Sequence, residues 1–216
     1  MKQLFLTSSA DYVAESVAKK IGEVQDKKLV FINTPVEGEE SDDYSWMDDD
    51  RNALKRVGFE TTDYTITNKG REQIQADLEP YEVIYVSGGN SYYFLDKARE
   101  TGFDKLIVDW VNTGKIYIGT SCGSIVAGVD INPARVLEDV AKAPGLKDTR
   151  GFGLVNLAVL PHWGSKSFKQ RYLKPGFAHT YDEKIPVLLL SNYEYLWVKN
   201  DWYKVVDVRE ENKKLT

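Results

Sequence analysis

Two hydrophobic patterns alternate along the first part of this 216-residue chain. Continuous apolar runs are typical of buried strands, and apolar positions that recur every three or four residues are typical of helices. The continuous runs predict strands at 3–6, 29–32, 83–86 and 116–118. The periodic segments predict helices at 12–21, 44–57, 70–78, 92–99 and 103–111. This alternation predicts an α/β fold in which helices cover both faces of a mostly parallel sheet.

The pattern is less regular after Gly128. Residues 130–147 carry few strand signals and predict a surface excursion near the ligand-binding edge of the sheet. An apolar run at 154–160 predicts a strand that leads into Pro161 and His162. The remaining segments predict a short helix, a buried strand and a C-terminal β-hairpin, at 167–173, 187–190 and 193–208. The length and the single alternating pattern predict one domain over residues 1–216.

Charge and composition narrow the possible partners. The formal net charge of −5 provides no basic field for a polyanion, so we expect no binding to nucleic acid. The apolar runs are too short to span a membrane, and the first residues lack the apolar core of a signal peptide. The single cysteine, Cys122, cannot form an internal disulfide and fits a reducing compartment. We therefore expect a cytoplasmic protein without membrane contact.

Acidic residues cluster at Asp42–Asp43 and at Asp48–Asp50. These clusters predict a solvated helix face, because the glycine spacing of a calcium-binding loop does not accompany them. The chain has only two histidines, His162 and His179, which argues against a histidine-rich metal site. We therefore expect no metal.

The motif around Ser121 is the main candidate for chemistry. Gly119-Thr120-Ser121-Cys122-Gly123 follows a predicted strand and precedes small apolar residues at helical spacing, which is the context that a G-x-S-x-G motif needs. A serine on so tight a turn is held in a strained conformation that presents its hydroxyl, and glycines let the strand and helix approach. The N–H of Cys122 opens the helix and points to where an oxyanion would develop. An ordinary turn between strand and helix is the alternative.

A serine nucleophile needs a base. His162 follows a predicted strand, so we expect it at the same edge of the sheet as Ser121; a loop histidine without a partner is the alternative. No strand leads into His179, for which we expect a structural role.

A second glycine-bearing turn, Gly88-Gly89-Asn90, follows the strand predicted at 83–86. The backbone N–H of Gly89 could join that of Cys122 as an oxyanion donor. Asn90 is a candidate for contact with the substrate and also for the N-cap of the next helix, and the two roles are compatible.

Three motifs, taken together and in this order, resemble a known family. Gly88-Gly89-Asn90, Gly119-Thr120-Ser121-Cys122-Gly123 and Leu160-Pro161-His162 are similar to the dipeptidase E (aspartyl dipeptidase) family of serine peptidases, to which cyanophycinases are related. The resemblance covers most of the chain. It implies a three-layer sandwich of the class I glutamine amidotransferase-like (flavodoxin-like) fold. It also implies cleavage of peptides or isopeptides with aspartate on the acyl side, without a metal or an organic cofactor.

The resemblance also implies roles for individual residues. Ser121 would be the nucleophile and His162 the base, with the backbone N–H groups of Gly89 and Cys122 as the oxyanion hole. A basic residue is then wanted for the carboxylate of the substrate. Arg171, shortly after His162, is the candidate, and a surface arginine without this role is the alternative.

The sequence departs from the family at two positions. Relatives often carry Asp or Glu in the turn that corresponds to residues 190–194, and Asn192 takes the place of that acid. An asparagine oxygen can still accept the N–H of a histidine, but it stabilises an imidazolium less well than a carboxylate does. Glu194 is the alternative third member. Cys122 stands where alanine is usual, and we expect it to be a packed small residue rather than a nucleophile.

The main hypothesis is a serine peptidase that acts on small acidic peptides through an acyl-enzyme. A catalytically weak or inactive binding protein on the same scaffold is the alternative, favoured by Asn192. Esterase activity, or thiol chemistry at Cys122, is a third option. We expect the aromatic residues Trp163, Trp197 and Trp202 to be exposed, where they could serve packing or the interface of a homodimer.

Overall fold

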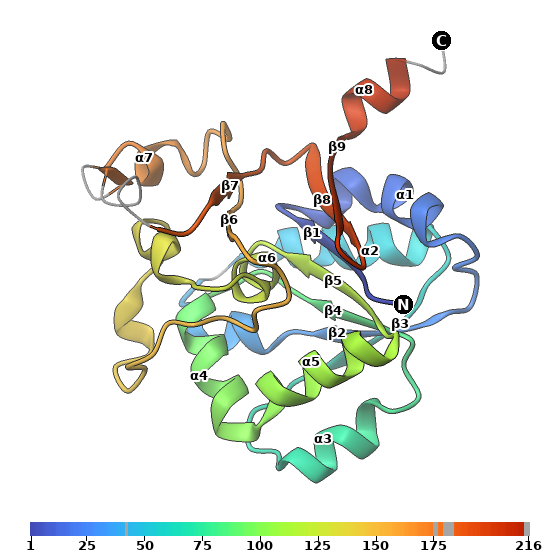
Figure 1. The fold of residues 1–216 in the computed structure, drawn as a ribbon, viewed down its shortest axis with the longest axis horizontal. Coiled ribbons are helices and arrows are strands. Elements are labelled where there is room, and N and C mark those ends of the chain that lie inside the picture. Colours follow the sequence, from blue (N-terminus) through green and yellow to red (C-terminus); the bar gives the residue numbers. More distant parts are fainter. Residues whose placement is uncertain (42, 175–176, 179–183, 214–216) are drawn as a thin grey trace.

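A seven-stranded sheet forms the centre of the computed structural model, which describes residues 1–41, 43–174, 177–178 and 184–213 (Figure 1). The strand order is β3-β2-β4-β5-β1-β8-β9. The strands are β1 (Gln3–Thr7), β2 (Lys28–Ile32), β3 (Glu60–Tyr64), β4 (Val83–Val86), β5 (Ile116–Thr120), β8 (Glu194–Lys199) and β9 (Trp202–Asp207). The first five of these strands are parallel neighbours, and β8 and β9 add an antiparallel hairpin at the edge next to β1. The α/β fold with a mostly parallel sheet and a C-terminal hairpin is thus confirmed.

Helices cover both faces of the sheet, which explains why β1, β2, β4 and β5 are almost continuously apolar. One face packs against α1 (Ala10–Ile21) and α2 (Ser45–Arg56). The other face packs against α3 (Arg71–Leu78), α4 (Ser91–Thr101), α5 (Phe103–Thr113) and α6 (Cys122–Ala127) (Figure 1). A short helix that the sequence did not predict, α8 (Val208–Lys213), follows the hairpin. In the described part of the chain, no helix has the length and apolar character needed to cross a membrane.

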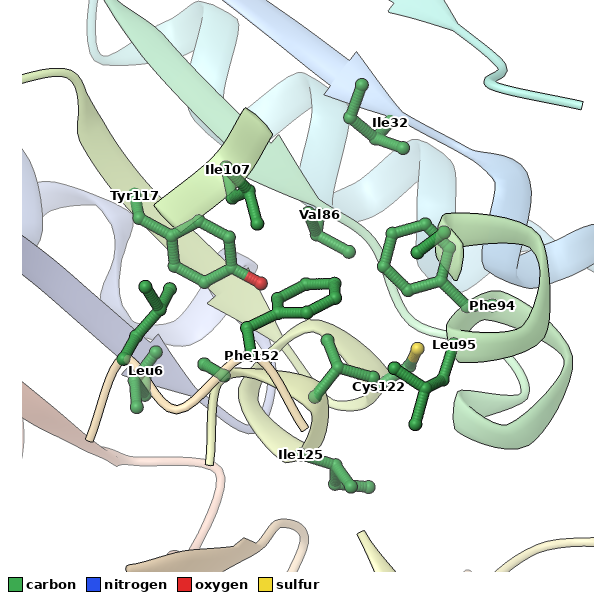
Figure 2. Packing of buried hydrophobic residues seen from close by; sticks show 14 of the residues in the cluster. Leu6, Ile32, Val86, Phe94, Leu95, Ile107, Tyr117, Cys122, Ile125 and Phe152 are labelled. Carbon is green, nitrogen blue, oxygen red and sulfur yellow. The ribbon is translucent and has the colours of Figure 1, made fainter. Parts of the chain in front are cut away.

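The core beneath α6 is densely packed and contains the only cysteine. Figure 2 shows the Cys122 thiol among Phe94, Leu95 and Ile125, on the face that α4 covers. Cys122 is fully buried, and burial raises the pKa of its thiol well above the ordinary value. A buried, protonated thiol is a poor nucleophile, so the thiol is a packed small side chain, as expected.

The strand that leads toward His162 is shorter than predicted and lies outside the main sheet. Within the described residues, β6 (Ala158–Leu160) pairs in parallel with β7 (Val187–Leu189) alone, and the two form a separate small sheet. The N–H groups of Leu154 and Val155 instead donate to the carbonyl of Ala127 at the end of α6. An apolar run indicates that a segment is buried, but it does not indicate which groups accept the backbone hydrogen bonds of that segment.

Two predictions about the surface are wrong. Asp50 was expected on a solvated helix face, but it is only 2% exposed, because it lies one turn from the buried residues Ala53 and Leu54 of α2. Its carboxylate accepts hydrogen bonds from the N–H of Asp11 and the hydroxyl of Tyr85. Trp197 is half-buried and its ring stacks on Phe5, with the ring centroids 6.3 Å apart. Asp42, in the other acidic cluster, lies outside the described residues.

Candidate active site

Ser121 occupies the sharp turn between β5 and α6, at the carboxyl end of a central strand. Its backbone has a positive φ of 50° with ψ −106°, which is a strained conformation for a residue with a side chain. A Cβ on Gly119 would lie 2.5 Å from the carbonyl oxygen of Gly123, and a Cβ on Gly123 would lie 2.3 Å from that of Val86. The two glycines therefore permit the close approach of strand and helix that forces Ser121 outward.

The structure brings Ser121, His162 and Asn192 together from three different segments. Nε2 of His162 lies 3.0 Å from Oγ of Ser121, and Nδ1 of His162 lies 2.9 Å from Oδ1 of Asn192. If Nδ1 carries the proton and donates to the Asn192 oxygen, Nε2 is left to accept the hydroxyl proton of Ser121. This is the tautomer that a general base requires.

The imidazole of His162 is kept neutral by its surroundings. Burial lowers the pKa of His162 to about 4; the hydrogen bond with Asn192 raises it, and the nearby guanidinium of Arg171 lowers it. A neutral imidazole at physiological pH can accept a proton. Asn192 is uncharged and cannot offset the effect of burial on the pKa of His162, whereas a carboxylate at this position would raise that pKa.

The backbone of His162 also has a positive φ, of 63°. Its N–H donates to Oγ of Ser8 at 3.0 Å, and the same hydroxyl donates to the carbonyl of Leu190. The N–H of Trp163 donates to that carbonyl as well. These bonds tie the His162 loop to the end of β1 and to the turn that carries Asn192. Ser8 was not predicted as a site residue, although it lies directly after the first strand, at the edge where ligands bind.

The Gly88-Gly89 turn lies beside Ser121. A Cβ on Gly88 would lie 3.5 Å from Cβ of Ser121, and Gly89 has φ 131°, a conformation that favours glycine. The N–H of Cys122 is in the first turn of α6, where amide groups have no partner inside the helix. Both turns therefore border the space in front of the Ser121 hydroxyl.

A cleft of about 470 Å³ opens over Ser121 and His162. Glu39, Glu138 and Arg171 are among the charged side chains that line it. Burial raises the pKa of Glu138 to about 7, while hydrogen bonds from Ser91 and the charge of Arg171 lower it. Arg171 is an exposed residue overall, but it borders the cleft and donates to the carbonyl of Leu137 at 2.6 Å. The cleft thus presents a cation between carboxyl groups.

The structure also locates two of the three other residues proposed from the sequence, Asn90 and Glu194. Asn90 is buried and caps α4: its side chain accepts from the N–H of Tyr93 and donates to the carbonyl of Asp139. Gly88 and Gly89 border the cleft, but Asn90 does not. The carboxylate of Glu194 accepts from the N–H of Ser191 at 2.8 Å, so Asn192, and not Glu194, contacts His162. His179 lies outside the described residues.

Among the residues that the structure describes, no group of three or more His, Cys, Asp or Glu side chains could hold a metal ion.

Known proteins that this chain resembles in sequence and in structure are named as peptidases. The model of peptidase family S51 matches residues 4–206. An uncharacterized peptidase of Pasteurella multocida, PM1590, is 31% identical over 93% of this chain and 95% of its own length. Peptidase E of Salmonella arizonae is 36% identical over a shorter stretch, 40% of this chain and 36% of that protein. A crystal structure from Listeria monocytogenes EGD-e, provisionally assigned as a Peptidase E protein, superposes with a TM-score of 0.86 at 27% identity, covering 96% of this chain and 98% of that one.

Proposed function

Since the chain belongs to peptidase family S51, we propose that it is a serine-type peptidase that cleaves small peptides or isopeptides with aspartate on the acyl side. The observation that carries the proposal is the pair of contacts of His162, at 3.0 Å from the Ser121 hydroxyl and 2.9 Å from the Asn192 oxygen. A hydroxyl, an imidazole and an orienting acceptor in this order make up the machinery of nucleophilic serine catalysis.

In the proposed reaction, Oγ of Ser121 attacks the carbonyl carbon of the scissile amide while Nε2 of His162 takes the hydroxyl proton. The resulting imidazolium gives this proton to the leaving nitrogen, the C–N bond breaks, and an ester to Ser121 remains. Water then attacks the ester, with His162 again as the base, and releases the acid and the free serine. Asn192 holds the imidazole in the required orientation throughout.

The backbone N–H groups of Cys122 and Gly89 serve as the oxyanion hole in this proposal. The strained turn at Ser121 supports it, and so does the neighbouring glycine turn: a Cβ on Gly88 would lie 3.5 Å from Cβ of Ser121, and Gly89 borders the same cleft. Donors fixed in place before the reaction stabilise the developing charge without reorganisation.

Arg171 is the proposed partner of the substrate's side-chain carboxylate. It borders the cleft, and its guanidinium is held by the Leu137 carbonyl, which leaves other N–H groups for a ligand. A guanidinium binds a carboxylate through paired hydrogen bonds. Replacing Arg171 by Met should therefore raise KM for aspartyl peptides about tenfold or more, whereas Lys169→Met, on the same helix, is the matched control.

The test of the proposed function combines labelling with hydrolysis. A fluorophosphonate probe should add covalently to Ser121, as read by mass spectrometry, and the wild-type protein should cleave aspartyl dipeptides faster than the asparaginyl equivalents. Ser121→Ala should abolish labelling and lower kcat/KM by about 10⁴-fold or more, and His162→Ala should slow both. A folded protein that never labels and cleaves no member of the panel would favour the alternative, a binding protein on the same scaffold, for which the neutral Asn192 is the supporting observation.

A further inference from the structure

One aromatic ring contacts two of the proposed functional side chains at once. The ring of Phe168 stacks on the imidazole of His162, with centroids 4.2 Å apart and planes inclined by 20°. Cζ of Arg171 lies 4.8 Å from the centroid of the same ring. Base and carboxylate-binding cation are therefore joined through Phe168, which also borders the cleft.

The segment that carries Phe168 is folded back on the His162 loop. Phe168 precedes α7 (Lys169–Tyr172), and its carbonyl accepts from the N–H of Arg171, so the two residues share one helical turn. The hydroxyl of Tyr172 donates to the carbonyl of Pro161 at 2.6 Å, which fastens the end of α7 to the start of the loop. The position of Phe168 relative to His162 is therefore set by short, local connections.

We propose that Phe168 is a positioning residue that fixes the plane of the His162 imidazole and the direction of the Arg171 guanidinium together. The proposal rests on the proposed function, since it concerns the base and the cation of that reaction. It adds that substrate recognition and proton transfer depend on one shared ring.

Stacking on Phe168 restrains a motion of the imidazole that its hydrogen bonds do not prevent. The two hydrogen bonds of His162, to Ser121 and Asn192, act in the plane of the ring and leave the imidazole some freedom to tilt out of that plane. A ring stacked on the imidazole face removes that freedom and excludes water from the face. A guanidinium that lies over an aromatic ring keeps its edge N–H groups available for a carboxylate.

The kinetic test compares Phe168→Leu with Phe168→Tyr. Phe168→Leu should lower kcat/KM for an aspartyl dipeptide 10- to 100-fold, with kcat reduced through His162 and KM raised through Arg171. For a small neutral ester, which has no carboxylate for Arg171, kcat alone should fall. Phe168→Tyr keeps the ring and should stay within about threefold of wild type. Leu173→Ala, an exposed apolar residue just after α7, is the matched control and should change neither constant.

A second measurement does not depend on activity. NMR titration can follow the imidazole protons of His162 in a His179→Gln background, because the chain has only two histidines. Among the described residues, the polar groups that face the ring are the Ser121 hydroxyl, the Asn192 amide and the Arg171 guanidinium. Phe168→Leu should remove the upfield ring-current shift and move the titration midpoint of His162 toward its ordinary value of 6.5, and Phe168→Tyr should restore both.

The two measurements separate the possible failures. A wild-type protein that neither labels nor cleaves would refute the proposed function, and the NMR result would still decide whether Phe168 holds the ring. If Phe168→Leu leaves both the His162 titration and kcat/KM at wild-type values, the proposal about Phe168 is overturned. Thermal unfolding of each variant checks the fold, and Phe168→Met, a flexible apolar side chain without a ring, serves in the same way should Phe168→Leu not fold.

Discussion

The buried hydroxyl of Ser8 accepts a hydrogen bond from the backbone N–H of His162, across 154 residues of sequence. The same hydroxyl donates to the carbonyl of Leu190, two residues before Asn192. One small side chain at the end of β1 thus connects the two segments whose side chains meet at the imidazole. The hydrogen bond from the His162 N–H to Ser8 also stabilises the positive-φ backbone of His162.

Replacing Ser8 by Ala should therefore impair both stability and catalysis. The N–H of His162 would lose its acceptor in a part-buried position, which costs about 1–3 kcal/mol in the free energy of unfolding. The imidazole would be less well placed, so we expect kcat to fall about tenfold with a smaller change in KM. Urea unfolding and steady-state kinetics measure the two effects, with Ser9→Ala, the next residue, as control. Wild-type kcat in Ser8→Ala would show that the bond has no part in placing the base.

The pH dependence of kcat/KM should follow His162. Because burial lowers its pKa to about 4, the acid limb for free enzyme should have its midpoint near pH 4, well below the ordinary 6.5 of histidine. The free energy of unfolding should also decrease at acid pH. The folded state prefers the neutral imidazole, so the stabilising contribution of His162 is complete above pH 6.5 and is lost as pH falls from 6.5 toward 4. A pH–rate profile of a labelled ester substrate measures the first effect. An acid limb centred at 6.5 would contradict the buried, neutral imidazole.

Asn192→Asp should raise activity at alkaline and neutral pH. A carboxylate at this position would stabilise the imidazolium that forms during proton transfer, and we expect kcat to rise about tenfold. It should also move the acid limb upward by about one pH unit or more, because a nearby negative charge favours the protonated imidazole. Asn192→Ala, which removes the acceptor, should lower kcat about 10- to 100-fold. If Asp and Ala at this position give the same rate, Asn192 does not orient the base.

Asp50 should affect stability in a pH-dependent way. Burial raises the pKa of Asp50 to about 7, while the hydrogen bonds from Tyr85 and Asp11 lower it. A carboxyl whose folded-state pKa lies above its unfolded value stabilises most at low pH, and its contribution declines as pH rises from about 3.8 to 7. Asp50→Asn should therefore be less destabilising at pH 8 than at pH 5, as thermal unfolding at both values can measure.

Asp50→Ala provides the comparison. It leaves the N–H of Asp11 and the hydroxyl of Tyr85 without their acceptor, which should cost about 2–4 kcal/mol in the free energy of unfolding at pH 5. Because Ala, like Asn, does not titrate, this cost should decline toward pH 8 by the same amount as for Asp50→Asn. A cost that does not change between pH 5 and pH 8 would show that Asp50 is already ionised in the folded state at pH 5, and would contradict its raised pKa.

The sequence alone determined the features that depend on neighbouring residues. Apolar runs predicted β1, β2, β4 and β5, because strands buried on both faces cannot contain polar residues at low cost. The turn at Ser121 was also predictable, because the small residues that a strained serine requires on either side lie next to it in the sequence. The resemblance to the dipeptidase E family rested on such short motifs, and the match to peptidase family S51 agrees with it.

Only the tertiary structure decided which distant groups meet. It placed Asn192 against His162 and turned Glu194 to the Ser191 N–H, a choice that strand alternation left open. It placed β6 and β7 in a sheet of their own, and it buried Asp50. Hydrogen-bond partners, stacking and burial depend on which segments pack together in space, and the packed segments are far apart along the chain. The pattern of local residue types placed His162 at the same edge of the sheet as Ser121, but it left these other partners open.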